Sequence, residues 1–174
     1  MGIQFETDYN METLTAMAKG LRKTVRRKRS RRVHIFAAVV LVLGLLTILA
    51  TVAGGEPLGA SGVVTLLAML VVILVSLFED RLNAWFARKR LLPGTEHAVA
   101  TFEEDGYVSA TSMSESKFSY AQIVAVAETA RYFVFALSSH HTQAYDKRNI
   151  RGGSVGDFRA FIAEKTGKLV ENIK

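Results

Sequence analysis

Two long apolar stretches dominate the pattern of hydrophobic and polar positions. The first, residues 33–53, reads VHIFAAVVLVLGLLTILATVA, and the second, residues 58–78, contains VVTLLAMLVVILVSLF without a charged side chain. About 20 consecutive apolar residues allow a helix to cross the hydrocarbon core of a membrane. The connecting segment is rich in glycine and contains Pro57, which favours a chain reversal. The pattern predicts a transmembrane helical hairpin. The alternative, a hairpin buried in a soluble domain, would need more covering residues than the flanks supply.

Before the hairpin, the pattern predicts a short strand followed by a helix. Residues 3–7 alternate apolar and polar positions, as a half-buried strand does, and so short a strand must pair with a distant segment. A helix is expected to begin at Asp8 or Asn10. Its apolar stripe would face either the bilayer interface or the soluble domain. The stripe comprises Met11, Leu14, Met17, Ala18, Leu21 and Val25.

After residue 96 the period of the pattern changes to two, which is typical of strands. Asp105 and Gly106 predict a tight hairpin, because glycine tolerates the positive φ of such turns. The pattern indicates a meander of about six antiparallel strands. The segments are residues 97–104, 106–113, 116–120, 123–128, 131–138 and 142–146.

The end of the chain predicts one amphipathic helix. Ser154 and Asp157 have the spacing of a capping box, and Gly167 suits the C-terminal stop. The expected fold class is membrane α+β: a transmembrane hairpin plus a small antiparallel β barrel or roll that this helix caps. The strand at residues 3–7 would fill an edge of that sheet. The apolar face of the helix consists of Val155, Phe158, Phe161 and Ile162.

Changes in composition divide the chain into four segments. Pro93 and Gly94 mark the start of the soluble domain. The segments are residues 1–32 (strand and basic helix), 33–78 (hairpin, with spans 33–53 and 58–78), 79–93 (juxtamembrane helix) and 94–174 (cytoplasmic domain).

The distribution of charge predicts the orientation. The net charge is +6, and residues 1–32 carry nine Lys or Arg against three acidic residues, whereas the loop between the spans has no basic residue. Basic residues beside a span are retained on the cytoplasmic side. We therefore expect a multi-pass protein of the inner (cytoplasmic) membrane with both termini in the cytoplasm.

The basic cluster before the first span is a candidate contact for anionic lipid, since each basic residue near a membrane surface contributes about 1 kcal/mol of attraction. Nucleic acid binding is disfavoured, because no aromatic platform is interleaved with the cluster. Trp85 is expected to be an interfacial anchor. The candidate lipid contacts are Arg26, Arg27, Lys28, Arg29, Arg31 and Arg32.

A second candidate site is an anion site before the last helix. Arg148, Arg151, Gly152 and Gly153 combine positive charge with free backbone N–H groups near a helix N-terminus. The segment lacks the spacing of a Walker motif, and a glycine-rich linker into a capped helix needs no ligand. A phospholipid or a phosphopeptide would be the ligand of such a site.

Catalytic signals are weak. The chain has no cysteine, so thiolate metal sites are excluded. Residues 103–105 are consecutive acids that alternate faces in a strand. His140 and His141 could bind a metal only with ligands from elsewhere, and His34 begins the first span. We therefore expect no enzymatic activity, no cofactor and no metal. A transporter is also disfavoured, because no Asp, Glu, Lys or Arg lies inside either span.

The order of these elements resembles the YcxB-like family of bacterial membrane proteins. The likeness rests on ETDY at residues 6–9 and on EDGYVSATSMSESKFSYAQIVAVAETARYFVFAL and AYDKRNIRGGSVGDFRAFIAEKTGK in the C-terminal part. Tyr120 stands where the family commonly has Trp, and Asp146 where it commonly has Pro. The resemblance implies a pleckstrin-homology-like (PH-like) fold for the C-terminal part and carries no biochemical activity with it.

The leading hypothesis is a non-enzymatic, membrane-anchored cytoplasmic binding or scaffold module. Its expected partners are membrane lipid and an unidentified protein, and the pattern leaves assembly into homo-oligomers open. The alternative is an oligomeric membrane regulator or immunity-type protein that acts through its spans. A third hypothesis, a hydrolase or metal enzyme, would use His140 and His141.

Overall fold

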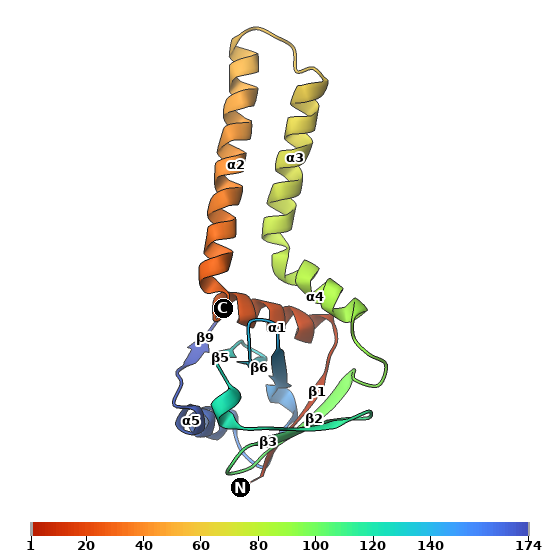
Figure 1. Ribbon diagram of the computed structural model, residues 1–174, viewed down its shortest axis with the longest axis vertical. Helices are drawn as coiled ribbons and strands as arrows, with labels where there is room; N and C mark the ends of the chain where they lie inside the picture. Colours follow the sequence, from red (N-terminus) through yellow and green to blue (C-terminus); the bar gives the residue numbers. More distant parts are fainter. Residues whose placement is uncertain (1, 174) are drawn as a thin grey trace.

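The computed structural model describes residues 2–173, and in it a helical hairpin projects from a domain of two sheets (Figure 1). The hairpin consists of α2 (Arg27–Ala53) and α3 (Ala60–Leu77), two helices that are long and apolar enough to cross a membrane. Their apolar side chains are exposed along their length, so the domain does not cover them. Helix α2 begins at Arg27 rather than at residue 33, because Arg and Lys are good helix formers. The predicted hairpin is present, and the buried alternative is wrong.

The domain contains one five-stranded and one four-stranded sheet. The order in the first is β4-β3-β2-β1-β8, and in the second β7-β6-β5-β9. The first sheet comprises β1 (Ile3–Asp8), β2 (His97–Phe102), β3 (Tyr107–Thr111), β4 (Glu115–Phe118) and β8 (Ile150–Arg151). The second comprises β5 (Ala125–Glu128), β6 (Tyr132–Ala136), β7 (Thr142–Asp146) and β9 (Val170–Asn172).

The six strands expected after residue 96 are present, but the barrel, one of the two forms expected for them, is wrong. In the described residues the strands form two open sheets, because capped 3₁₀ turns redirect the chain from one sheet to the other. Ser119 caps η1 (Tyr120–Gln122) between β4 and β5, and Asp146 caps η2 (Lys147–Asn149) between β7 and β8. Strand β9 pairs in parallel with β5, so the second sheet is mixed rather than antiparallel.

The N-terminal strand joins the C-terminal sheet. Strand β1 lies between β2 and β8, with Phe5 opposite both Ala100 and Ile150. Helix α1 (Met11–Lys23) follows, and Asn10 caps it by accepting from the backbone N–H groups of Glu12 and Thr13. After the hairpin, α4 (Glu79–Lys89) packs against α1. The hairpin is therefore an insertion between two parts of one packed unit, and the four-segment division stays a prediction.

The core between the two sheets is rich in aromatic side chains. Helix α5 (Val155–Thr166) closes it as predicted, with Phe158 and Ile162 fully buried. The rings of Phe5 and Phe158 lie 4.6 Å apart in an edge-to-face arrangement. The capping box of Ser154 is formed, and Gly167 adopts the left-handed conformation that ends the helix.

The predicted β-hairpin at Asp105 and Gly106 is present between β2 and β3, but the reason for glycine at position 106 differs from the predicted one. Gly106 does not have a positive φ. Instead, a Cβ at this position would lie 2.5 Å from the carbonyl oxygen of Phe118. Glycine is required because β3 and the end of β4 approach closely there.

Candidate functional site

The base of the hairpin is fastened to the domain through α1 and α4. Figure 1 shows α1 lying across the base of the hairpin, with α4 beside it. The Arg22 guanidinium makes two hydrogen bonds to the Asp80 carboxylate, at 2.7 and 2.6 Å, and these bonds raise the pKa of Arg22. A bidentate pair of this kind fixes direction as well as distance. The orientation of the hairpin is thereby tied to the domain.

Helix α1 also packs closely on the second sheet. A Cβ at Gly20 would lie 2.7 Å from a methyl carbon of Val134 in β6, so only glycine allows this approach. Leu14 and Leu21 are buried on the same helix. The stripe predicted for this helix therefore faces the domain and α4.

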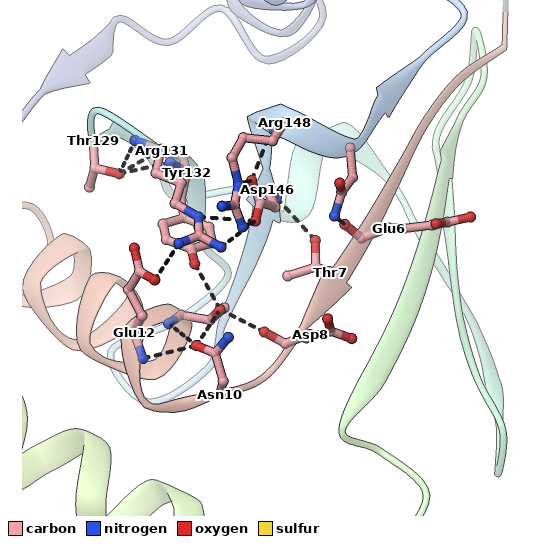
Figure 2. Close-up of polar contacts among 12 residues, drawn as sticks. Glu6, Thr7, Asp8, Asn10, Glu12, Thr129, Arg131, Tyr132, Asp146 and Arg148 are labelled. Atoms are coloured by element: carbon pink, nitrogen blue, oxygen red, sulfur yellow. Dashed lines mark hydrogen bonds and ion pairs between the residues drawn. The ribbon is translucent and has the colours of Figure 1, made fainter.

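A polar network around Asp146 joins the N-terminal segment to the second sheet (Figure 2). The buried Asp146 carboxylate accepts from Arg131 at 3.2 Å and from Arg148 at 2.9 Å, and its backbone N–H donates to Thr7 at 3.1 Å. Arg131 also pairs with Glu12 at the start of α1. Sequence reasoning missed this network, because its members come from four distant segments.

The predicted lipid contacts lie at the start of α2. Arg26 precedes the helix and donates its Nε to the carbonyl oxygen of Ser139 at 2.6 Å. The others are exposed on the first turns of α2, and the predicted contact with lipid stays a prediction. These residues are Arg27, Lys28, Arg29, Arg31 and Arg32.

The residues of the predicted anion site have partners within the chain. Arg148 pairs with Asp146, and Arg151 pairs with Glu6 at 3.0 Å. Gly152 has a φ of +80°, and a Cβ there would lie 2.4 Å from the carbonyl oxygen of Gly2. A Cβ at Gly153 would lie 3.3 Å from the side chain of Ile3. These contacts account for the residue types without a ligand, and the anion site stays a prediction.

Trp85 lies on α4 and is 44% exposed. The Nζ atom of Lys89 is 3.6 Å from the centre of its ring, and the ring of Phe86 is 4.9 Å away, edge to face. Its role as an interfacial anchor stays a prediction.

Glu128 holds two cations from different elements. Its carboxylate accepts from Arg159 in α5 at 2.7 Å and from Lys147 in η2 at 2.9 Å. The Arg159 hydrogen bonds, with help from Lys147, lower the pKa of Glu128 to about 2 against the opposing effect of burial. Glu128 therefore links η2 and α5 to the second sheet.

The weak catalytic candidates do not come together. Glu103 and Glu104 lie in the exposed turn after β2, where Glu104 is 3.8 Å from Lys165. His140 and His141 are exposed in the turn between β6 and β7. The described part of the chain contains no group of three or more His, Cys, Asp or Glu side chains that could hold a metal ion.

A cleft of about 680 Å³ lies where the hairpin meets the domain. It is bounded by α1, the start of α2, α4 and the turn at residues 138–142. Its lining includes Arg26 and Arg29, two of the lipid contacts predicted from the sequence. Arg90 and His140 line the same cleft. No signal in the sequence indicates that these four residues lie together, because Arg90 and His140 are far from the basic cluster along the chain.

One of the comparisons with known proteins finds a match, in the C-terminal part of the chain. Residues 102–162 match the family model described as YcxB-like protein. This match confirms the resemblance predicted from the sequence, over the region that contains β3 to β8 and most of α5. No curated protein and no solved structure was found to match the chain.

Proposed function

We propose that this protein is a non-enzymatic, membrane-anchored binding module, because its YcxB-like region, residues 102–162, packs through β6 and β7 on α1 at the base of an apolar helical hairpin. In this proposal α2 and α3 both cross the inner membrane, and both termini are cytoplasmic. The domain binds membrane lipid or a protein partner at the membrane surface. We further propose a PH-like fold, which the two open sheets and the helix packed on their core support.

The observation that carries the proposal is the insertion of the hairpin into the domain. Strand β1 and helix α1 enter the fold before the hairpin, and every other strand follows it. The Arg22–Asp80 pair and the Gly20–Val134 contact then hold the two parts together. A flexible tether would need neither contact. This construction favours a domain held at a fixed height and orientation relative to the spans.

The cytoplasmic orientation is supported by charge. Basic residues flank the domain end of both helices, whereas the exposed loop at the far end of the hairpin carries Glu56 and no basic residue. This distribution supports a cytoplasmic domain in the proposal, because basic flanks are retained on the cytoplasmic side of a membrane.

Site-specific photocrosslinking in native cells tests the proposal. A photoreactive amino acid at Met113, Val124 or Leu169 probes exposed apolar positions of the domain, and one at Leu46 or Leu70 probes exposed positions of the spans. The proposal predicts discrete crosslinked products from the domain positions. Products from the span positions alone would contradict it and support the alternative, an oligomeric regulator that acts through its spans.

A further inference from the structure

The cleft at the base of the hairpin contains positively charged side chains that form no ion pair with the described residues, 2–173. Arg29 and Arg90 line it from α2 and from the end of α4, and neither forms an ion pair among residues 2–173. Arg26 lines it too, and among residues 2–173 the only hydrogen bond of its side chain is to the carbonyl oxygen of Ser139. Guanidinium groups bind phosphate oxygens through paired hydrogen bonds. Three such groups around one cleft favour an anionic ligand.

One carboxylate oxygen in the cleft accepts no hydrogen bond from residues 2–173. The Oε2 atom of Glu79 is buried and accepts no hydrogen bond. Two side-chain nitrogen atoms, Nε of Arg22 and Nε2 of His34, are each 3.7 Å away, which is beyond hydrogen-bonding distance. A buried acceptor is normally satisfied. The ligand that completes this site therefore offers a hydrogen-bond donor in addition to its negative charge.

The position of the cleft distinguishes a lipid from a soluble anion. Val33, the first residue of the apolar stretch, lines it, as does Phe86 on α4. On the opposite side it is lined by His140 and His141 of the domain. If the hairpin crosses the membrane, this places the cleft at the level of the lipid headgroups, where basic pockets beside spans hold phospholipids. Its volume of about 680 Å³ lies within the usual range of ligand sites.

From these observations we infer that the cleft binds the headgroup of an anionic membrane phospholipid. The phosphodiester lies between Arg29 and Arg90, with Arg26 beside it, and a headgroup hydroxyl, as in a glycerol headgroup, donates to Glu79. This inference rests on the proposed function, because it requires the hairpin to be in the membrane. It replaces the lipid contact predicted for the whole basic cluster before the first span with one defined binding site.

Native mass spectrometry of the full chain in a neutral detergent tests the inference. The probes are dioctanoyl phosphatidylglycerol, dioctanoyl phosphatidylmethanol and inorganic phosphate. The two lipids carry the same charge, but only the first has headgroup hydroxyls. We expect phosphatidylglycerol to bind at least tenfold more tightly than inorganic phosphate, and about fivefold more tightly than phosphatidylmethanol. Equal binding of inorganic phosphate and phosphatidylglycerol would overturn the assignment to a lipid.

Two sets of variants locate the site. Arg29→Gln with Arg90→Gln removes two charges from the cleft and should weaken phosphatidylglycerol binding at least tenfold. Arg27→Gln with Arg31→Gln removes the same charge from exposed positions outside the cleft and should change binding less than threefold. Equal losses in the two double variants would show a diffuse electrostatic contact and overturn the inference.

Glu79→Leu tests whether a headgroup hydroxyl donates a hydrogen bond to Glu79. It should bring the ratio between phosphatidylglycerol and phosphatidylmethanol binding close to one, because the acceptor for the hydroxyl is gone. An unchanged ratio would refute the role of Glu79. If lipid binding shows no preference while the domain positions still give photocrosslinked products, this inference fails and the proposed function stands. If the crosslinks are also absent, both fail.

Discussion

Replacement of Glu128 by Gln tests whether the buried carboxylate between α5 and η2 stabilises the domain. The side chain is 6% exposed and contacts Lys147 and Arg159, which join the second sheet to elements outside it. Gln has nearly the same shape but no charge. The substitution therefore leaves the packing intact and removes only the anion.

The expected loss of stability follows from the pKa of Glu128, which falls from 4.5 to about 2 in the folded chain. A difference of this size corresponds to about 3 kcal/mol of stability. Because Arg159 is about half exposed, solvent screens part of this interaction, and we expect a loss of about 2 kcal/mol at pH 7. The folded pKa is depressed, so the contribution is complete above about pH 4.5 and is lost as the pH falls through about 2.

The assay is chemical unfolding of the full chain in detergent micelles, followed by near-ultraviolet circular dichroism of the tyrosines in the domain, from pH 7 to pH 2. The difference in the free energy of unfolding between wild type and Glu128→Gln should shrink towards zero at the acidic end. Glu104→Gln is the matched control, since Glu104 is 87% exposed and its contact with Lys165 is long. It should change stability by less than about 0.5 kcal/mol. A Glu128→Gln variant as stable as this control at pH 7 would refute the reasoning.

The remaining predictions concern the junction between the hairpin and the domain. Gly20→Ala should destabilise the domain by about 1–3 kcal/mol, because the new methyl group meets Val134 at 2.7 Å, whereas Gly156→Ala in α5 should stabilise it by about 0.5–1 kcal/mol, because its nearest neighbour is at 3.6 Å. Thermal unfolding of both variants checks this, and a stabilising Gly20→Ala would contradict the close approach. Asp80→Asn should cost about 1–2 kcal/mol and increase hydrogen exchange at the start of α4, because it removes the anion that Arg22 binds in two hydrogen bonds. Exchange rates equal to those of wild type would show that the ion pair does not hold the two helices together.

Features that depend on neighbours in the sequence could be predicted. The two apolar runs identify α2 and α3 because each run is long and unbroken. The last helix was predicted with both of its ends, since Ser154, Asp157 and Gly167 act within one turn of the helix they terminate. The alternation of apolar and polar residues likewise located the six strands after residue 96.

Features that depend on pairing between distant segments could not be predicted in the same way. Nothing in residues 3–7 indicates that β1 lies inside the sheet between β2 and β8, because register depends on the partner strands. The three residues of β9 are too few to show a period. Of the predicted barrel or roll, the barrel was wrong because the turns capped by Ser119 and Asp146 look like ordinary loops in the sequence, although they send the chain into another sheet.

The same distinction holds for the candidate site. The sequence identified the basic residues before the first span as a group, because they are contiguous. It could not assign Arg29 and Arg90 to one cleft, since α4 lies beside the start of α2 only in the folded chain, where both helices contact α1. The sequence likewise could not show that a buried oxygen of Glu79 accepts no hydrogen bond from the described residues, because this depends on the folded chain.

The central claim is that the hairpin crosses the membrane and holds the domain on its cytoplasmic side. The chain contains no cysteine, so single thiols can be introduced without background labelling. Glu56→Cys probes the exposed hairpin loop, and Met113→Cys probes the domain, where the native side chain is 71% exposed. A membrane-impermeant maleimide should label residue 56 in intact cells and residue 113 only after permeabilisation. Labelling of residue 113 in intact cells, with residue 56 protected, would contradict the account.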